Sequence, residues 1–562
     1  MTPGRRRGIT KTASVSEGDG AATWWRGATI YQVYPRSFLD TNGDGVGDLP
    51  GVVKGLDYIA HLGVDGLWLS PFFTSPMRDY GYDVADYCDV DPVFGTLADF
   101  DRLLAKAHAL GLKVIIDQVY SHTSDHHAWF RESRADRFNE KADWYVWADA
   151  KPDGGPPNNW LSVFGGPAWT WDARRRQYYL HNFLASQPDL NLYNKAVQNA
   201  LIAVAQFWLD RGVNGFRLDA LNFGMHDRKL RNNPPADGAG APYATPYEFQ
   251  KSQRNLSYHF MTGFLERLRT AINAYDGVHT VAEIADADPL AAMQSFTQGD
   301  GRLNAAYNFD FLYAERLEPR TVVSALSAWS GGEGEGWPAW AFSNHDAPRV
   351  ASRWTDNAPL EQCARLYLLL LAALRGNIFL YQGEELGLPQ ADLALEDLKD
   401  PEAIANWPAT LGRDGARTPM PWRRGARAAG FTDGVPWLPV PEDHYGRSID
   451  EQEKDPASVL CFARGVIGMR NRYASLRSGA VCFENTPDGL LAFLRTSGDE
   501  QCLCVFNLSD YDVSWTPPDW KQFRILAAVA LGNGEDVVVD VRPSAPLPTY
   551  LSPASGYVAL RR

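Results

Sequence analysis

The sequence is poor in cysteine and contains no CxxC pair. Its six cysteines are scattered along 562 residues, and Cys502 and Cys504 are separated by one residue, so a strand would place both on one face. We expect a core role for them, since neither a disulfide framework nor a zinc site is supported. This usage suits a reducing compartment, and we expect a cytoplasmic protein.

Long hydrophobic runs are missing as well. The longest, LYLLLLAAL at 366–374, is much shorter than the ~20 apolar residues that span a membrane, and it indicates a buried helix. The N-terminal stretch 1–22 carries basic residues but no apolar segment after them, which is not the pattern of a secretory signal. We expect residues 1–22 to be a disordered tail, and we expect no membrane partner.

The chain also lacks an excess of positive charge. It has 54 Lys and Arg residues against 68 Asp and Glu residues, and its net charge is -14. A protein that binds nucleic acid needs a basic surface that neutralises phosphate, so we expect no nucleic-acid partner. Aromatic residues, by contrast, are abundant at 12%, with 19 tryptophans. They indicate either a large core or surfaces that stack on flat apolar ligand faces such as sugar rings.

From Trp24 onward, short β-rich runs alternate with longer helical patterns, which is typical of βα units and a parallel sheet. Eight such units close naturally into a barrel, so the predicted fold class is α/β, a (β/α)8 TIM barrel. The eight predicted strands are 29–35, 66–72, 113–119, 215–221, 279–284, 305–312, 340–346 and 378–385.

Two stretches depart from this alternation. About 95 residues separate the third strand from the fourth, and residues 121–190 are dense in Trp, Pro, Gly, Asn and His, which indicates a functional insertion. After about residue 475, short strands with turn signals predict a small antiparallel β domain. The predicted domains are the barrel (23–120 and 191–475), an insertion domain after strand 3 (121–190) and a C-terminal β-sandwich (476–562).

Charged side chains collect where the predicted strands end, which in a (β/α)8 barrel is the face that carries the active site. A single carboxylate there could be a helix cap or a surface charge. Several at one mouth repel one another and lose solvation, a cost that function usually explains. The residues at or just after these strand ends are Asp117, His122, Arg217, Asp219, Glu283, His345 and Asp346.

Two or three carboxylates without a phosphate-binding loop suit glycoside hydrolysis. One carboxylate attacks the anomeric carbon, and a second, whose pKa is raised, protonates the leaving oxygen. Arg217 lies two residues before Asp219, so a strand presents both on one face. A fixed cation there would hold Asp219 ionised as a nucleophile.

Four ordered motifs make the sequence resemble the α-amylase superfamily, glycoside hydrolase family 13, from about Trp24 to the C-terminus. They are DQVYSH (117–122), GFRLDA (215–220), AEI (282–284) and SNHD (343–346), and QPDLNL (187–192) resembles a fifth. The segments WWRGATIYQVYPRSF, GDGVGDLPG and RTPMPW are similar to the α-glucosidase and oligo-1,6-glucosidase branch. Long-polymer amylases are less similar.

The resemblance implies a role for each position. Asp219 would be the nucleophile, Glu283 the general acid/base, and Asp346 would hold the sugar's hydroxyls and favour ring distortion. Three further residues would contact the sugar or steady the carboxylates: His122, Arg217 and His345.

The segment DYGYD (79–83) matches the branch's pocket motif, so Asp79 and Tyr82 would help to form the subsite for the non-reducing glucose. Arg413, in GRDGARTPMPW, would lie opposite, and an Asp79–Arg413 pair would close the floor of the pocket. A closed floor implies exo-action on short chains. Phe164 and Phe183, in the insertion, are candidates for packing against the sugar, although either alone could be a core residue.

The segment DTNGDGVGD (40–48) carries oxygen ligands at alternate positions, the spacing and chemistry that hard cations such as calcium prefer. It is not a true EF-hand, because the twelfth loop position is Gly51 rather than Glu. The branch that it resembles binds calcium or magnesium here as a structural ion, and a glycine-rich turn without metal is the alternative. No organic cofactor is expected. The candidate ligands are Asp40, Asn42, Asp44, the carbonyl of Val46 and Asp48.

Ala220, directly after the implied nucleophile, departs from the branch, where Val or Thr is associated with α-1,6 or α-1,4 preference. Linkage preference therefore stays open. The resemblance implies a retaining, exo-acting α-glucosidase that acts on di- and oligosaccharides from the non-reducing end and transfers some glucose to alcohol acceptors. The alternative is a sucrose-acting hydrolase, glucosyltransferase or isomerase on the same scaffold. We expect a monomer or a homodimer.

A non-catalytic relative, such as a scaffold or the partner subunit of a transporter, would be a different class of function. Such a protein should lack one or more of the catalytic carboxylates and usually needs a membrane anchor. This sequence keeps all three carboxylates and has no apolar run of membrane-spanning length. We therefore expect an enzyme.

Overall fold

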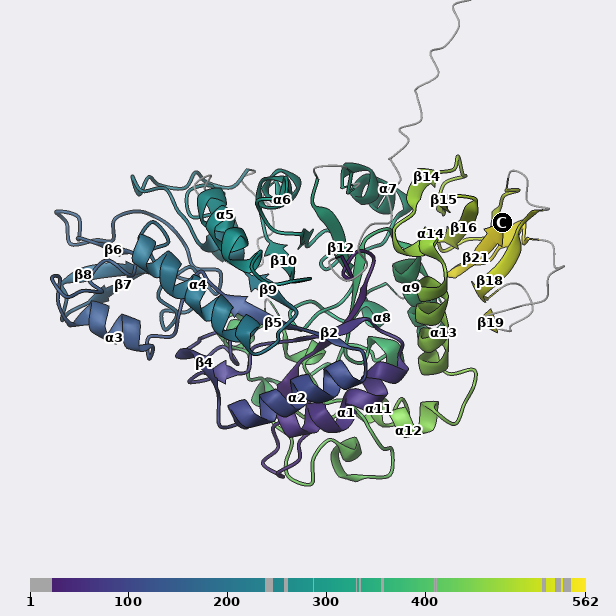
Figure 1. Cartoon of the computed structure of the whole chain (residues 1–562), viewed down its shortest axis with the longest axis horizontal. Helices are drawn as coiled ribbons and strands as arrows, with labels where there is room; N and C mark the ends of the chain where they lie inside the picture. The colour runs from purple at the N-terminus through teal and green to yellow at the C-terminus, as the bar shows by residue number, and fades with distance from the viewer. Residues whose placement is uncertain are drawn as a thin grey trace, which may run out of the picture.

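The structure is a computed structural model, and it describes residues 23–237, 246–256, 261–286, 288–329, 331–332, 335–354, 358–408, 410, 412–517, 522–530, 537–538 and 547–561. The predicted tail, residues 1–22, lies outside the described residues. Along the long axis of Figure 1, the insertion lies at the left, the barrel in the centre and the C-terminal sheet at the right.

Eight parallel strands form a closed barrel in the order β1–β13–β12–β11–β10–β9–β5–β2, so the predicted (β/α)8 fold is confirmed. Inward-pointing side chains, among them Trp68, Ile115 and Phe379, form a separate core inside it. The barrel strands are β1 (Thr29–Val33), β2 (Gly66–Leu69), β5 (Lys113–Val119), β9 (Gly215–Asp219), β10 (His279–Ile284), β11 (Ala305–Asn308), β12 (Trp337–Ala341) and β13 (Asn377–Tyr381).

Helices surround the barrel, and local signals in the sequence start several of them. Thr96 and Asp99 form a capping box at the start of α2, and Asn194 caps α4. The apolar run 366–374 falls largely within α9, and the side chains of this run are buried, as predicted. The principal helices are α1 (Leu49–His61), α2 (Leu97–Ala109), α4 (Lys195–Asp210), α5 (Met261–Ile272), α6 (Pro289–Thr297), α7 (Pro319–Ala328), α8 (Val350–Arg353), α9 (Leu360–Ala373), α10 (Pro401–Asn406), α11 (Glu442–Tyr445), α12 (Ile449–Gln452), α13 (Val459–Arg472) and α14 (Ala474–Arg477).

The seventh strand is displaced from its predicted position. It was expected at 340–346, but β12 spans Trp337–Ala341, and His345 and Asp346 therefore lie in the loop after it. Asn344 Oδ1 accepts the N–H groups of Asp346 and Ala347, at 2.8 and 2.7 Å, which turns the chain away from strand geometry. Pro338 concealed the true start, because proline is rare within strands.

The insertion contains α3 (Ala128–Ala135) and a three-stranded antiparallel sheet in the order β6–β8–β7. Its two ends return to the same place, because His122 and Asp189 form an isolated antiparallel bridge just beyond β5. The insertion is thereby held over the carboxyl ends of the barrel strands. Its strands are β6 (Trp147–Ala148), β7 (Trp169–Asp172) and β8 (Gln177–Leu180), and the short pair β3 (Phe73–Thr74) and β4 (Asp86–Val90) lies earlier in the chain.

The C-terminal part forms a six-stranded sheet in the order β14–β15–β16–β21–β18–β19, with a separate two-stranded sheet of β17 and β20. Cys502 and Cys504 belong to the core that contains α9, whereas Leu503 belongs to the core on the other face of the sheet, as the spacing predicts. The strands are β14 (Ala480–Phe483), β15 (Leu490–Ser497), β16 (Glu500–Asn507), β17 (Val513–Ser514), β18 (Arg524–Val529), β19 (Val537–Val538), β20 (Tyr550–Leu551) and β21 (Ser555–Arg561). The domain boundaries given above stay predictions.

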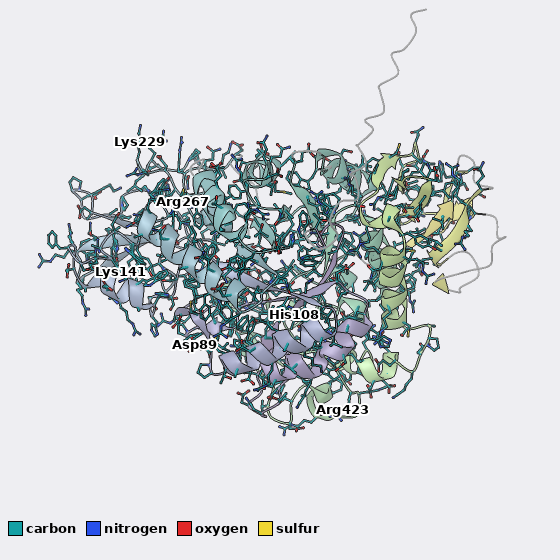
Figure 2. All side chains as sticks on the ribbon, viewed as in Figure 1. Asp89, His108, Lys141, Lys229, Arg267 and Arg423 are labelled. Atoms are coloured by element: carbon teal, nitrogen blue, oxygen red, sulfur yellow. The ribbon has the colours of Figure 1, made fainter. Side chains whose placement is uncertain are left out.

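Charged side chains such as Asp89, Lys229 and Arg423 are exposed (Figure 2). All six cysteines are free. Within the described ranges, no helix has both the length and the apolar character needed to cross a membrane.

Candidate active site

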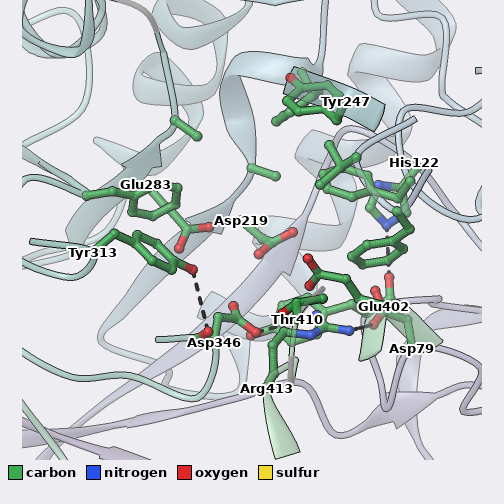
Figure 3. A pocket seen from close by; sticks show the side chains of 18 of the residues that line it. Asp79, His122, Asp219, Tyr247, Glu283, Tyr313, Asp346, Glu402, Thr410 and Arg413 are labelled. Atoms are coloured by element: carbon green, nitrogen blue, oxygen red, sulfur yellow. Dashed lines mark hydrogen bonds and ion pairs between the residues drawn. The ribbon is translucent and has the colours of Figure 1, made fainter. Parts of the chain in front are cut away.

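A cavity of about 500 Å³ opens at the carboxyl ends of the barrel strands (Figure 3). Its walls come from the barrel, from the insertion and from loops that follow β9, β11 and β13, so segments far apart in the sequence meet here. The described residues that line it are Asp79, Tyr82, His122, Val163, Phe164, Phe183, Asp219, Ala220, Phe223, Tyr247, Glu248, Glu283, Ala285, Phe309, Tyr313, Asp346, Glu402, Thr410 and Arg413.

Arg217 joins three carboxylates beneath this cavity. Its side chain is fully buried, and its Nη1 donates to Asp117 Oδ1 at 2.9 Å and to Asp219 Oδ1 at 2.5 Å. Its Nη2 forms an ion pair with Glu283 Oε2 at 2.6 Å. The guanidinium also lies 4.9 Å from the centre of the Trp68 ring. The planar guanidinium therefore fixes Asp219 and Glu283 relative to each other.

Burial sets the protonation of these carboxylates. It raises the pKa of Asp219 to about 7 and the pKa of Glu283 to about 7, and Arg217 opposes both shifts. Arg217 thus lowers the pKa of Asp219 in the predicted direction, but burial has the larger effect, and an ionised Asp219 stays a prediction. One cation shared among three buried carboxylates does not offset their desolvation. Burial likewise raises the pKa of Asp117, which shares the same Arg217 nitrogen with Asp219, to about 6.

Asp346 has a different environment from Asp219. Arg417 Nη2 donates to its Oδ1 at 2.6 Å, and His345 Nε2 lies 3.2 Å from its Oδ2. Burial alone would raise the pKa of Asp346, but His345, Arg417 and Arg413 together hold it below its usual range. Asp346 is therefore ionised at neutral pH.

His345 is neutral and has a defined tautomer. Burial lowers its pKa to about 3. Gln32 Nε2 lies 2.9 Å from its Nδ1, which places the ring proton on Nε2, 2.6 Å from the Tyr82 hydroxyl. Tyr82 in turn donates to Asp117 at 3.1 Å and stacks on the His345 ring at 5.2 Å. Tyr82 and His345 thus form a chain of contacts from Asp117 to Asp346.

The floor of the cavity contains the ion pair between Asp79 and Arg413, with Arg413 Nη2 2.9 Å from Asp79 Oδ1. Asp400 Oδ1 lies 2.7 Å from the same nitrogen, and Arg413 Nη1 lies 3.5 Å from Asp346 Oδ1. Gln187, from the fifth motif, donates to Asp79 at 2.9 Å. Arg413 therefore faces three carboxylates, as Arg217 does.

Aromatic side chains form the wall supplied by the insertion. The guanidinium of Arg413 lies 5.0 Å above the Phe164 ring, and Phe183 packs against His122 at 5.1 Å and Phe223 at 4.9 Å. Phe164 and Phe183 both line the cavity and pack edge to face, with ring centres 5.9 Å apart. Ala220 lies beside them in the left-handed conformation (φ 40°), which costs a non-glycine residue roughly 1–2 kcal/mol.

Sequence reasoning missed several residues of the site. Arg417 lies in the RTPMPW segment, but nothing in that segment indicates that its side chain reaches Asp346. The remaining residues lie in connections and short helices between the barrel elements, and only the abundance of aromatic residues hinted at some of them. They are Val163, Phe223, Tyr247, Glu248, Ala285, Phe309, Tyr313, Glu402 and Thr410 around the cavity, with Asp400 behind Arg413.

The predicted metal loop, residues 40–48, uses its oxygens for its own turns. Asp40 accepts the N–H groups of Asn42, Gly43 and Gly45, and Asp48 accepts that of Gly51 at the start of α1. Among the described residues, no cluster of three or more His, Cys, Asp or Glu side chains could hold a metal ion. The calcium or magnesium site stays a prediction.

The chain matches known proteins along most of its length. The α-amylase catalytic-domain family matches residues 32–479, and the C-terminal domain of maltogenic amylase matches residues 482–538. A probable α-glucosidase of Rhizobium meliloti (strain 1021) is 51% identical, over 89% of this chain and 91% of its own. An oligo-1,6-glucosidase of Heyndrickxia coagulans is 37% identical, over 91% of this chain and 96% of its own.

A crystal structure of an α-glucosyl transfer enzyme superposes with a TM-score of 0.89 and 48% identity, and covers 96% of this chain and 99% of its own. Family, relatives and fold therefore agree with the carboxylates around Arg217. The chain belongs to the α-amylase catalytic-domain family and is a glycoside hydrolase of its α-glucosidase and oligo-1,6-glucosidase branch.

Proposed function

We propose that this protein is a retaining, exo-acting α-glucosidase that releases glucose from the non-reducing end of short α-glucosides. The observation that carries the proposal is the attachment of Asp219 and Glu283 to the two amino nitrogens of one guanidinium, at 2.5 and 2.6 Å. Retaining enzymes hold their two carboxyl groups about 5–5.5 Å apart, whereas inverting enzymes leave about 6.5–9.5 Å for a water. A shared planar cation favours the shorter separation.

In the proposed reaction, Asp219 attacks the anomeric carbon and Glu283 protonates the leaving oxygen. A covalent glucosyl-enzyme results, and Glu283 then takes a proton from the water or alcohol that releases the sugar. The reaction needs Asp219 ionised and Glu283 protonated. Because burial raises both pKa values to about 7, the ionised and the protonated form of each carboxyl are both accessible near neutral pH.

The floor of the cavity supports exo-action. The Asp79–Arg413 ion pair and the packing of Arg413 on Phe164 lie in the wall of the cavity next to Asp346. A glucosyl unit bound against this wall would have no room for a further sugar behind it. Cleavage therefore removes one terminal glucose, as in an exo-acting enzyme.

The charges favour neutral substrates. Arg413 is the one cationic side chain among the described residues that line the cavity, and three carboxylates already engage it. Glu248 and Glu402 lie on the remaining walls. A phosphorylated disaccharide would bring its dianion towards carboxylates without a free cation, so we expect neutral sugars and alcohols to be preferred.

Transfer to sugar or alcohol acceptors is part of the proposal, and action on sucrose is the alternative. The solved relative described as an α-glucosyl transfer enzyme supports the transfer activity. Water and acceptor compete for the same glucosyl-enzyme, so the ratio of products depends on the acceptor side of the cavity.

One experiment tests both parts. Purified protein is incubated with maltose, isomaltose, sucrose and trehalose 6-phosphate, with and without glycerol, and the anomeric form of the first glucose released is followed by NMR. We expect α-glucose from at least one of the first three, glucosyl-glycerol when glycerol is present, and little reaction with the phosphorylated sugar. Initial release of β-glucose, or no release of glucose from any of the first three sugars, would contradict the proposal.

We further propose that the loop of residues 40–48 binds calcium or magnesium as a structural ion. All its donors are oxygens, which suits hard cations, and Asn42 and Asp44 are exposed. Saturating calcium should raise the melting temperature by about 2–5 °C over protein in chelator. Asp44→Ala should abolish this rise, and an unchanged rise in that variant would contradict the proposed ligand set.

A further inference from the structure

Four asparagines, three of them buried and one exposed, connect the insertion to the long loop after β9. They are Asn159 and Asn182 of the insertion and Asn233 and Asn255 of the loop, and we call them the amide clamp. Asn182, Asn233 and Asn255 are at most 3% exposed. No predicted motif includes them, and none of them lines the cavity.

Asn233 is the centre of the amide clamp. Its Nδ2 donates to Gln250 Oε1 and Asn255 Oδ1, both at 2.9 Å, and its Oδ1 accepts the N–H groups of Gln253 and Arg254 at 3.2 and 2.9 Å. The Asn159 side chain pairs with its main chain, at 2.8 and 3.0 Å. Every polar group of this buried amide therefore has a partner, which fixes its position.

The amide clamp continues into the wall of the cavity. Asn255 Nδ2 donates to Asn182 Oδ1 at 2.8 Å, and Asn182 Nδ2 donates to Asp189 of the fifth motif. The carbonyl of Asn182 accepts the N–H of Val163, and Phe183 follows it directly. Asn182, at the insertion's end of the clamp, is therefore adjacent in sequence to Phe183, which lines the part of the cavity that would hold the glucosyl unit, here called the glucosyl pocket.

The loop at the other end of the clamp forms another part of the cavity wall, which contains Tyr247 and Glu248. Pro235 bridges Gln250, and Ala236 N donates to the Phe249 carbonyl at 3.0 Å, so the base of the loop is a short antiparallel ribbon. The 3-10 helix Pro246–Phe249 leads into the second side of this ribbon, and its Tyr247 and Glu248 line the cavity. In Figure 3, Tyr247 lies across Asp219 from Arg413, on the side away from the closed floor.

We propose that the amide clamp positions the wall of Tyr247 and Glu248 relative to the glucosyl pocket, and so determines how well the group beyond the scissile bond binds. Its asparagines are positioning residues, because none touches the cavity. The proposal rests on the proposed function, and it identifies the wall of Tyr247 and Glu248 as the acceptor side of the same site. Asp219 and Glu283 are held by Arg217 and not by the amide clamp. Loosening the clamp should therefore weaken binding of the leaving group and the acceptor but leave the first chemical step intact.

The test compares two donors that differ only in what lies beyond the scissile bond. α-Glucosyl fluoride has a leaving group too small to reach the wall, whereas a disaccharide places a whole sugar against it. In Asn233→Asp, the carboxylate cannot donate to Gln250 or Asn255, although it keeps the acceptor for Gln253 and Arg254. We expect kcat/KM for the fluoride to stay within about twofold, the KM for the best disaccharide to rise at least fivefold, and transfer to glycerol relative to hydrolysis to fall about fivefold.

Two further variants serve as a matched control and as a substitute if Asn233→Asp does not fold. Asn232→Asp makes the same chemical change one residue away, on an exposed side chain that only accepts a hydrogen bond from Asn159 N, and it should match the wild type. If Asn233→Asp shows no cooperative melting, Gln250→Ala, which removes part-exposed contacts to Asn159 and Asn233, is measured instead. Equal loss with both donors, or no change with either, overturns the inference. A wild type that does not turn over α-glucosyl fluoride overturns the proposed function instead.

Discussion

The two ends of the barrel each contain a fully buried arginine, and the two arginines have opposite surroundings. At the mouth, Arg217 faces Asp117, Asp219 and Glu283. At the base, where β1 and β13 begin, Arg470 donates to five main-chain carbonyls, those of Gly27, Ala372, Leu374, Gly376 and Leu476. Burial lowers the pKa of Arg470 well below its usual value, whereas carboxylates raise that of Arg217 against the effect of burial.

The difference shows what each end does. Carbonyls at the base are neutral, fixed acceptors, so Arg470 joins α9, α13 and the strand starts without any group that can react. The mouth concentrates ionisable groups whose pKa values lie near 7, which is costly for stability and useful for proton transfer. In (β/α)8 barrels, chemistry belongs to the carboxyl end of the strands and stability to the other end.

The largest expected effect is at the mouth. Asp219→Asn removes the proposed nucleophile, so kcat should fall by at least about 10⁴-fold. The melting temperature at about pH 5 should be preserved, because Asp219 is mostly protonated there and the amide still fits beside Arg217. Steady-state kinetics on the best disaccharide and a thermal melt measure the two quantities. Activity near that of the wild type would contradict the assigned nucleophile.

Glu283→Gln separates proton delivery from attack. Loss of the general acid should cost about 10²–10⁴-fold on a disaccharide, whose leaving oxygen needs a proton. With α-glucosyl fluoride, whose leaving group needs little protonation, formation of the glucosyl-enzyme should be far less affected. The ratio of kcat/KM for the two substrates, in variant and wild type, measures this difference. A uniform loss with both would argue against an acid role.

At the base, the same kind of change should affect stability alone. Arg470→Met leaves five buried carbonyls without their donor, and each unsatisfied group costs about 1–3 kcal/mol, so the free energy of unfolding should fall by at least about 3 kcal/mol. The protein that remains folded should keep the wild-type kcat. Denaturant unfolding with active-site titration measures both. If kcat fell while the unfolding midpoint held, the contrast between the two ends would fail.

The smallest expected effect is a pH dependence of stability. Asp219 and Glu283 have pKa values of about 7 in the folded protein, above the ordinary value of a carboxyl. Folding therefore retains protons that the unfolded chain has lost above about pH 5, and this contribution to stability disappears as the pH rises through 7. Asp219→Asn removes one such group, so its melting temperature relative to the wild type should be higher at pH 8 than at pH 5. A difference independent of pH would contradict the raised pKa.

Much of the fold and the site was accessible from sequence, because the signals were local. Every barrel strand except the seventh starts within one residue of its predicted start, since buried parallel strands are short, continuous apolar runs. Charged residues at strand ends pointed to Asp219 and Glu283, and the resemblance pointed to the Asp79–Arg413 pair. The seventh strand was misplaced because Pro338 masks its start. Asp400 and Arg417 were missed because they act on residues distant in sequence.

The sequence by itself determined the order of strands and helices, the insertion and the chemical types at the mouth, because periodicity, caps and motifs depend on neighbouring residues. The tertiary structure alone decided which groups share a cation, how far burial raises the pKa of Asp219, and that asparagines of two distant loops meet in the amide clamp. These properties depend on distance and desolvation in three dimensions, which are fixed only when remote segments pack together.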